Sequence, residues 1–269
     1  MLHNALPSPA LRPFVRAYAQ REIEAHDPAF TLHVIAQLEQ VINFELGVLP
    51  GLFHRTGTIR DRIWVGGSQT SFAARMFVTP GVETFAVIFY PTGLSRLINI
   101  PASAITDRCF DATSLCPSLR TLWNHLGEET SFKGRVALTE KFLMRLLAVT
   151  VTENPMAASA ARLFRHKGNL RVADLAAQRS IGIRQFERLF FREIGITPKT
   201  YARIARFQAA LDARLNNPSR SWTDIAHDLG FHDQMHLIHD FKKLADDSPS
   251  ALLSVIGDTR PPALTGSDM

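Results

Sequence analysis

The second half of the sequence contains an internal repeat, in which residues 174–198 align with residues 224–249. Each copy has a short helical stretch with a small residue, a turn of three or four residues, and a second helical stretch. With one residue inserted after Met235, the matched pairs are Asp174 with Asp224, Leu175 with Ile225, Ala176 with Ala226, Phe186 with Leu237, Phe190 with Phe241 and Pro198 with Pro249. This pattern predicts two helix-turn-helix units in tandem.

Small and apolar residues explain how each unit would pack. Ala176 and Ala226 let the two helices of a unit cross closely, and Ile181 or Phe231 in the turn fills the space between them. A helical pattern over 198–216 joins the units and would be about 28 Å long. Successive major-groove faces on one side of DNA lie about 34 Å apart, so this linker suits two helices in adjacent grooves. The alternative, a helical solenoid, needs about three repeats.

The basic charge of the chain is concentrated in the repeat region. Residues 162–245 carry 15 Lys and Arg against 8 Asp and Glu, whereas residues 1–154 carry 14 against 13. Residues 246–269 carry one Arg and four Asp. A basic segment of this kind is typical of a module that binds a polyanion, although scattered charge on a helical surface gives the same count.

Residues 157–255 resemble the DNA-binding domain of the AraC/XylS family of bacterial transcription regulators. The resemblance rests on "VADLAAQRSIGIRQFERLFFREIGITPKTYARIARFQAALDARL" and "WTDIAHDLGFHDQMHLIHDFKKLADDSPSALL". The first half is similar to the small β-rich sensor domain of some members, through "LPSPALRPFVRAY" and "FAVIFYPTGLSRLINIPASAITDR". The resemblance implies a transcription regulator whose partner is double-stranded DNA.

The second helix of the first unit should present a polar face to the major groove. Phe186, Leu189 and Phe190 repeat at helical spacing and should face the core. Arg can bond guanine with two hydrogen bonds, Gln can do the same to adenine, and Glu can accept from cytosine. By resemblance, positions 184, 187 and 188 reach bases, and the alternative is a solvated charged face. The expected base-contacting residues are Arg184, Gln185, Glu187 and Arg188.

The matching helix of the second unit departs from the family. Met235 stands where the family commonly has Ser or another small polar residue, and His239 where it often has Arg. Exposed Met and Ile offer only apolar contact, for example to a thymine methyl group, and Asp240 adds a negative charge near the DNA backbone. We therefore expect weaker base reading here, with positioning as the alternative role. The expected base-contacting residues are Gln234, Met235, His236, Ile238 and His239.

Both recognition helices lack the Ser that usually caps them in the family. Gly182 and His232 stand in the place of this Ser. Asp233, which follows His232, compensates in part for the missing cap through the helix dipole. Phosphate contacts are expected from the start of the linker helix, where N–H groups are exposed, and from basic residues nearby. The expected phosphate-contacting residues are Arg192, Lys199, Thr200, Arg203, Arg206 and Lys242.

Three histidines, His232, His236 and His239, fall near one stripe of the second recognition helix. Such spacing could hold a zinc ion. However, no H-E-x-x-H motif is present, no Cys lies nearby, and the stripe coincides with the groove-facing side. We therefore expect these histidines to face DNA or its edge, and we expect no metal and no cofactor.

The first half of the chain is predicted to be β-rich, because short runs of aromatic and β-branched residues alternate with Gly and Pro. Such runs occur at 30–38, 41–47, 62–67, 71–78 and 84–90, and they suggest a barrel or sandwich. Helical spacing follows at 118–126 and 134–150. The helix at 134–150 either forms a dimer interface or covers the barrel. The second half should form helices near 157–166, 171–179, 183–194, 198–216, 221–229, 233–244 and 248–255.

These patterns predict an α+β chain with two domains. Residues 1–152 should form a β-rich, barrel-like sensor or dimerisation domain that ends in helices, and a break at 152–160 leads on to a second domain. Residues 157–256 should form an all-α domain with two helix-turn-helix units joined by a long helix. Residues 257–269 are predicted to be disordered.

No catalytic motif supports enzyme activity in the first half. H-x-H, G-x-S-x-G, a Gly-rich phosphate loop and C-x-x-C are absent, and the isolated His33 and His54 are interpreted as structural. One aromatic set either lines an apolar ligand pocket or forms the barrel core. That set comprises Phe44, Phe53, Trp64, Phe72, Phe77 and Phe89.

The chain is expected to act in the cytoplasm. Two cysteines, Cys109 and Cys116, make no disulfide framework, and neither a signal peptide nor an apolar run of about 18 residues is evident. The expected function is that of a DNA-binding regulator, acting as a homodimer without membrane contact. RNA polymerase and a small-molecule effector are candidate partners. The alternatives are a protein-partner scaffold with secondary DNA binding, and a β-domain enzyme fused to a DNA anchor.

Overall fold

The computed structural model describes residues 1–149 and 155–256, which divide into two units. The first, here called the β unit, comprises residues 1–32, 39–68 and 74–153. The second, the helical unit, comprises 33–38, 69–73 and 154–269. The expected disordered tail and the first residues of the expected linker lie outside the described residues.

Two sheets form the body of the β unit. The six-stranded sheet has the order β1 (Leu2–Ala5), β2 (Val15–Glu22), β9 (Glu83–Phe89), β4 (Gln40–Glu45), β7 (Ile63–Gly66) and β10 (Cys109–Asp111), and all its neighbours are antiparallel. The four-stranded sheet has the order β3 (Phe30–Val34), β8 (Ala74–Val78), β5 (Gly51–His54) and β6 (Gly57–Ile59). Together with the helices that follow, this architecture confirms the predicted α+β fold.

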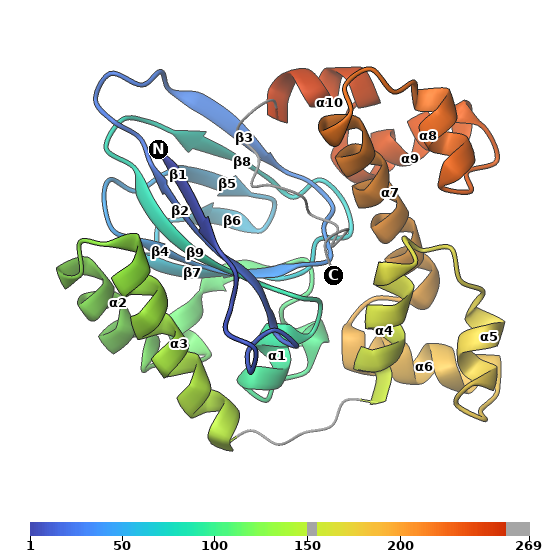
Figure 1. The fold of residues 1–269 in the computed structure, drawn as a ribbon, viewed down its shortest axis with the longest axis horizontal. Coiled ribbons are helices and arrows are strands. Elements are labelled where there is room, and N and C mark those ends of the chain that lie inside the picture. Colours follow the sequence, from blue (N-terminus) through green and yellow to red (C-terminus); the bar gives the residue numbers. More distant parts are fainter. Residues whose placement is uncertain (150–154, 257–269) are drawn as a thin grey trace. The chain divides into compact units, whose positions relative to one another are not determined.

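Three helices cover one face of the six-stranded sheet: α1 (Gly93–Leu97), α2 (Leu119–Glu128) and α3 (Phe132–Val149) (Figure 1). In β9, Phe85, Val87 and Phe89 alternate with less buried residues and point into this layer, as the period of a strand requires. Leu122 of α2 and Leu143 of α3 pack against them. The core of the β unit therefore lies between sheet and helices.

Half of the strands follow from sequence pattern and half do not. The runs expected at 30–38, 41–47, 62–67, 71–78 and 84–90 correspond to β3, β4, β7, β8 and β9; the first four strands are shorter than predicted, and β9 is shifted by one residue. Strand β2 was missed because its "AYAQRE" stretch is poor in β-branched residues. Pairing with β1 on one side and β9 on the other places it in the sheet, so tertiary context overrides its weak propensity.

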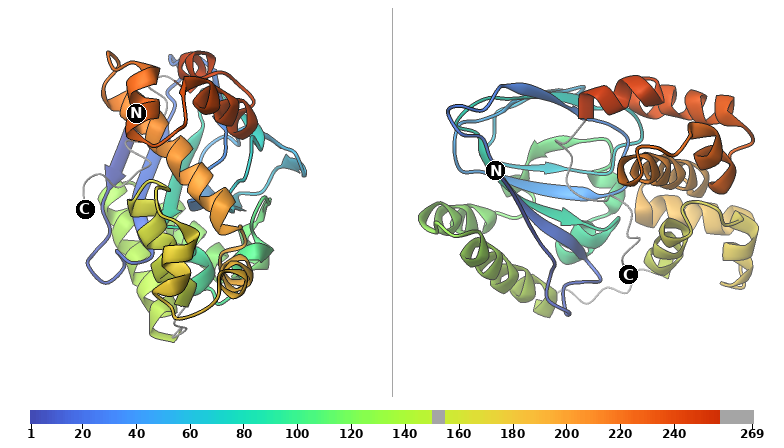
Figure 2. Two further views of the ribbon diagram at one scale, coloured as in Figure 1. Left: turned by 90° about the vertical axis from the view of Figure 1, so that its right-hand side faces the viewer. Right: turned by 45° about the horizontal axis from the view of Figure 1, so that its top comes forward.

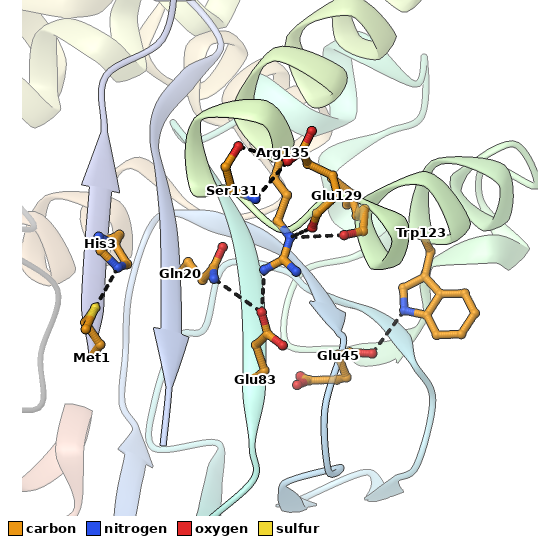
Figure 3. Close-up of polar contacts among 10 residues, drawn as sticks. Met1, His3, Gln20, Glu45, Glu83, Trp123, Glu129, Ser131 and Arg135 are labelled. Atoms are coloured by element: carbon orange, nitrogen blue, oxygen red, sulfur yellow. Dashed lines mark hydrogen bonds and ion pairs between the residues drawn. The ribbon is translucent and has the colours of Figure 1, made fainter. Parts of the chain in front are cut away.

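A buried arginine joins the turn between α2 and α3 to the sheet. Arg135 of α3 forms an ion pair with Glu83 of β9, and its Nε donates to the carbonyl oxygens of Leu126 (3.0 Å) and Glu129 (2.8 Å) (Figure 3). Gln20 of β2 also donates to Glu83, over 3.3 Å. These bonds satisfy a charge that would otherwise be costly to bury.

Glu45, at the end of β4, is a buried carboxyl that is 1% exposed. Trp64 Nε1 donates to its Oε1 over 2.7 Å and Thr84 Oγ1 to its Oε2 over 2.6 Å. Trp123 Nε1 donates to its main-chain oxygen over 3.0 Å (Figure 3). Burial raises the pKa of Glu45 to about 7, against the opposing effect of the Thr84 and Trp64 hydrogen bonds and of Arg62. Desolvation therefore outweighs hydrogen bonding at this carboxyl.

The helical unit contains seven helices among its described residues: α4 (Pro155–Arg165), α5 (Val172–Ala177), α6 (Ile183–Ile194), α7 (Pro198–Asn216), α8 (Trp222–Asp228), α9 (Gln234–Ala245) and α10 (Pro249–Ile256). The bounds of α6 and α7 are those predicted. Helix α7 contacts α4 and α6 as well as α8 and α9 (Figure 2). Eleven of its 19 residues are buried, so it is the central element of this unit.

Candidate nucleic-acid interface

The structure confirms the internal repeat. Helices α6 and α9 both have 12 residues and are buried at matched positions. Helices α5 and α8 begin the two copies, and each buries an aliphatic residue followed by alanine. The matched buried pairs are Leu175 with Ile225, Ala176 with Ala226, Phe186 with Leu237, Phe190 with Phe241 and Ile194 with Ala245.

The two turns have the same backbone geometry. Ser180 and Gly230 occupy the left-handed region at φ of 53° and 69°. After each, an N–H donates back across the turn to the alanine oxygen of the first helix, over 3.2 Å from Ile181 and 2.9 Å from Phe231. The left-handed conformation costs free energy for a residue other than Gly. Because Ser180 adopts it nevertheless, the turn geometry is required in both units.

The extra residue of the second copy lies in the turn and not after Met235, as the alignment had placed it. His232 is inserted between Phe231 and Asp233, which precedes α9 and accepts a hydrogen bond from His236 N over 2.7 Å. Asp233 is therefore the N-cap, and the expectation that His232 occupies that position was wrong. An insertion inside the helix would rotate all later side chains, whereas a turn absorbs it.

Helix α6 brings its expected base-contacting residues together on one exposed face. Arg184, Gln185, Glu187 and Arg188 are all exposed, opposite the buried Phe186 and Phe190. Gly182 caps this helix without a side-chain hydrogen bond, as expected. Phe191, which is 52% exposed, extends the same face one turn past Glu187 and Arg188. Phe191 was not identified from the sequence, although its i+3 spacing from Arg188 was the available signal.

Helix α9 exposes Met235 (69%) and His239, while Ile238 is only partly exposed. Gln234 is tied to the first helix of its unit, because Thr223 Oγ1 donates to its Oε1 over 2.8 Å. Thr223 was not identified from the sequence. The first two turns of α9 thus expose the apolar Met235 beside two imidazoles, those of His236 and His239.

His236 is engaged with the protein. Its Nδ1 accepts from His232 N over 3.4 Å, its Nε2 lies 4.0 Å from Asp240 Oδ2, and its ring packs edge-on against Phe231 at 5.6 Å. Within the described part of the chain, no group of three or more His, Cys, Asp and Glu is arranged to hold a metal ion.

Asp240 does not face outward as expected but forms an ion pair inside the unit. Arg203 Nε of α7 donates to its Oδ1 over 2.8 Å, and the Asp240 side chain is 5% exposed. The guanidinium of Arg206 lies over the Phe231 ring at 5.3 Å, and burial lowers its pKa while Asp240 opposes this shift. Both arginines therefore have partners in the second unit.

The other expected phosphate-contacting residues lie at the surface. Lys199 is exposed in the first turn of α7, which Thr197 caps by accepting from Thr200 N over 3.2 Å. Arg192 pairs with the adjacent Glu193 at 2.9 Å, and Lys242 Nζ donates to the Asp246 oxygen over 2.8 Å. Exposed pairs of this kind are weak and can exchange for a phosphate.

The six aromatic residues interpreted as either the lining of a ligand pocket or the barrel core do not gather in one place. Phe44 and Phe89 belong to the core beneath the helices, whereas Phe53 and Phe77 form an exposed ring pair on the four-stranded sheet with centroids 5.6 Å apart. Phe72 packs edge-on against His33. Side chains that alternate along a strand point to opposite faces, which a list of aromatic positions cannot resolve.

A different, apolar pocket lies in the β unit between the six-stranded sheet and the helices. Ile42 and Val65 form its floor, and Leu94, Leu119 and Phe142 are among its walls. No helix within residues 1–149 or 155–256 combines the length and apolar character needed to cross a membrane.

Residues 175–254, from α5 into α10, match a family model described as a helix-turn-helix domain. The C-terminal domain is an AraC-type helix-turn-helix domain. Residues 3–111 match a model described as a domain of unknown function, DUF6597. No curated protein sequence matches the chain.

Two similar solved structures combine an AraC-type domain with a β-rich first half. The crystal structure of ToxT from Vibrio cholerae O395 is 10% identical, with a TM-score of 0.51 over 96% of this chain and 98% of that chain. ToxT bound to (E)-4-(8-methylnaphthalen-1-yl)but-3-enoic acid is also 10% identical, with a TM-score of 0.50 over 95% and 99%. At this identity the likeness concerns the fold.

Proposed function

We propose that this chain is a transcription regulator whose two AraC-type units read two successive major-groove segments of DNA. One observation carries the proposal: two matched units share a single 19-residue helix, α7, and each exposes the first turns of its second helix. A helix of this length spans about 28 Å, close to the roughly 34 Å that separates successive grooves on one face of DNA.

The first unit supplies most of the polar reading. Arg184 and Arg188 suit guanine, Gln185 suits adenine, and Glu187 suits the amino group of cytosine. All four are exposed on α6, and Phe186 and Phe190 hold the opposite face in the core. The second unit contributes Met235, Ile238 and His239, together with Gln234 and His236 at its edges.

Phosphate contacts position both helices. Lys199 and Thr200 lie in the first turn of α7, where backbone N–H groups attract an anion. Arg192 and Lys242 contribute from the exposed sides of α6 and α9. Arg203 Nε is bonded to Asp240 and the Arg206 guanidinium lies over Phe231, so a phosphate contact from either arginine competes with these interactions.

The β unit responds to a small-molecule effector. ToxT has been crystallised with an organic acid that has a large apolar body, and the β unit of this chain contains an apolar pocket beneath α1 and α3. The pocket has a volume of about 10 Å³, which is room for about one water-sized group. Such a ligand would therefore bury its apolar body there only after α1 and α3 move apart, and this movement would bias the helical unit. A thermal-shift screen of aromatic and aliphatic acids on the full chain tests this part.

The regulator acts as a homodimer that contacts RNA polymerase. Sedimentation of the full chain tests the first statement, and co-purification with the polymerase core and sigma factor tests the second. Neither is needed for the two-segment reading, which a monomer can perform.

Selection of bound duplexes from a random library by the full-length protein tests the central proposal. We expect two boxes about one helical turn apart, and affinity that falls steeply as salt rises. Weak binding at every salt concentration, with no enriched sequence in the presence or absence of the acids found by thermal shift, would overturn it.

A further inference from the structure

The two recognition helices carry different chemistry at equivalent positions. Their equal lengths and matched buried residues fix the register, in which Ile183 of α6 corresponds to Gln234 of α9. The first unit has three charged side chains where the second has a thioether, an aliphatic group and an imidazole. The corresponding pairs are Arg184 with Met235, Glu187 with Ile238, and Arg188 with His239.

Met235 is the most exposed of the large apolar side chains in the described helical unit, at 69%. It lies in the first turn of α9, one turn before His239 on the same exposed stripe. Leu237 and Phe241 hold the opposite face of the helix in the core. Met235 is therefore an apolar side chain at the tip of the second recognition helix that the protein does not bury.

The polar side chains beside Met235 are held by the protein. Recognition of adenine by an amide uses its oxygen and nitrogen together, and Gln234 Oε1 already accepts from Thr223. Both ring nitrogens of His236 face groups of the same unit, His232 N and the Asp240 carboxylate. Base recognition near the helix tip thus falls to Met235.

Among the base edges of the major groove, the C5-methyl group of thymine is the apolar feature. We propose that the second unit recognises thymine through this methyl group, with Met235 as the specificity-determining residue and Ile238 flanking it. This inference rests on the proposed function. It gives the second unit an apolar mode of recognition, whereas the first unit recognises bases by charge and hydrogen bonds.

Replacing single thymines by deoxyuridine tests the inference, because it removes the methyl group and leaves every hydrogen-bonding group in place. The probe is the duplex selected by the full-length protein, with one thymine of the second box changed at a time. Loss of one buried methyl group should weaken binding about three- to fivefold at the contacted position. The same change in the first box should leave affinity within about twofold.

Variants of Met235 identify the residue responsible. Met235→Ala should weaken binding to the thymine duplex and bind the thymine and uracil duplexes equally, whereas Met235→Leu should keep the preference. Ile183→Ala is the matched control, since it truncates an exposed apolar residue at the first position of α6. It should leave the uracil effect in the second box unchanged. Unaltered melting temperatures show that the variants fold.

The outcomes separate this inference from the function on which it rests. A uracil effect that Met235→Ala abolishes supports it. A second box without thymine, or a uracil effect that persists in Met235→Ala, overturns it while the DNA-reading function stands. A single enriched box that is lost in Arg184→Ala also overturns it and limits base reading to α6. Absence of any enriched site overturns both.

Discussion

Arg203 Nε of the linker helix donates to Asp240 Oδ1 of the second recognition helix over 2.8 Å, and the two side chains are 33% and 5% exposed. The bond joins α7 to α9 at the middle of the recognition helix. It therefore fixes the orientation of the second unit relative to the helix that both units share.

Removing the cation should destabilise the helical unit. Arg203→Met leaves the Asp240 carboxylate buried beside Arg206 and the His236 ring, without its closest cation, so we expect the free energy of unfolding to fall by about 2–3 kcal/mol. Arg192→Ala is the control, because Arg192 pairs only with its neighbour at the surface and should cost less than about 0.5 kcal/mol. Urea unfolding followed by circular dichroism measures both, and equal small losses would show that the pair does not secure α9.

The same variant separates positioning from phosphate contact. If Arg203 secures α9, Arg203→Met should weaken binding to the second box while the salt dependence of the affinity keeps its slope. A phosphate contact would instead lower the magnitude of that slope by about one. Titration of the selected duplex at several salt concentrations distinguishes the two roles.

Arg184 should carry specificity for one box. Arg184→Ala removes a side chain able to form two hydrogen bonds to guanine, and we expect a loss of about 1–3 kcal/mol confined to one position of the first box. Competition among single-base variants of the selected site measures this loss. A uniform loss across all variants would assign Arg184 to the DNA backbone.

The two recognition helices should respond differently to changes at their caps. Asp233→Ala removes the side-chain bond to His236 N and should lower the stability of the helical unit. Gly182 has open space around the position of a Cβ and an extended backbone, so Gly182→Ser should add a few tenths of a kcal/mol. The urea midpoints of the two variants show whether each substitution raises or lowers stability. A destabilised Gly182→Ser would show that this cap position does not tolerate a side chain.

Glu45 should make the stability of the β unit depend on pH. Its folded-state pKa is about 7, above the ordinary value of 4.5. The contribution of the neutral Glu45 carboxyl to the free energy of unfolding is therefore fully present below pH about 4.5 and is lost as pH rises through 7. The loss is at most about 3 kcal/mol. Glu45→Gln should show a smaller fall in melting temperature between pH 5 and 8, and the exposed Glu128→Gln should behave as wild type. Parallel curves for all three proteins would contradict the account.

Local signals were sufficient to predict the helical unit. The spacing of Phe186 and Phe190 and the Thr197-Pro198 start define the bounds of α6 and α7, since each depends on residues a few positions apart. The alignment misplaced the inserted residue because Met235 and His232 lie in a stretch with no matching side chains. Backbone geometry at Gly230 and the cap at Asp233 locate it in the turn.

Contacts between distant residues were not predictable in the same way. From the sequence, Asp240 is expected to be a surface charge. In the fold it bonds to Arg203, which lies 37 positions earlier in the chain. Phe53 and Phe89 are both aromatic strand residues, yet one is exposed and the other is in the core, because strand pairing and the covering helices decide which face is buried. Periodicity within one segment does not contain that information.

The spacing of the two boxes tests the central claim most directly. In the proposed function, both recognition helices meet DNA from the same side, with boxes about 10 base pairs apart, because α7 is one continuous helix. Inserting five base pairs turns the second box to the opposite face. We predict that affinity then falls to that of a duplex with the first box alone, and that insertion of a full turn does not restore it. Unchanged affinity after the five-base-pair insertion would contradict simultaneous reading by both units.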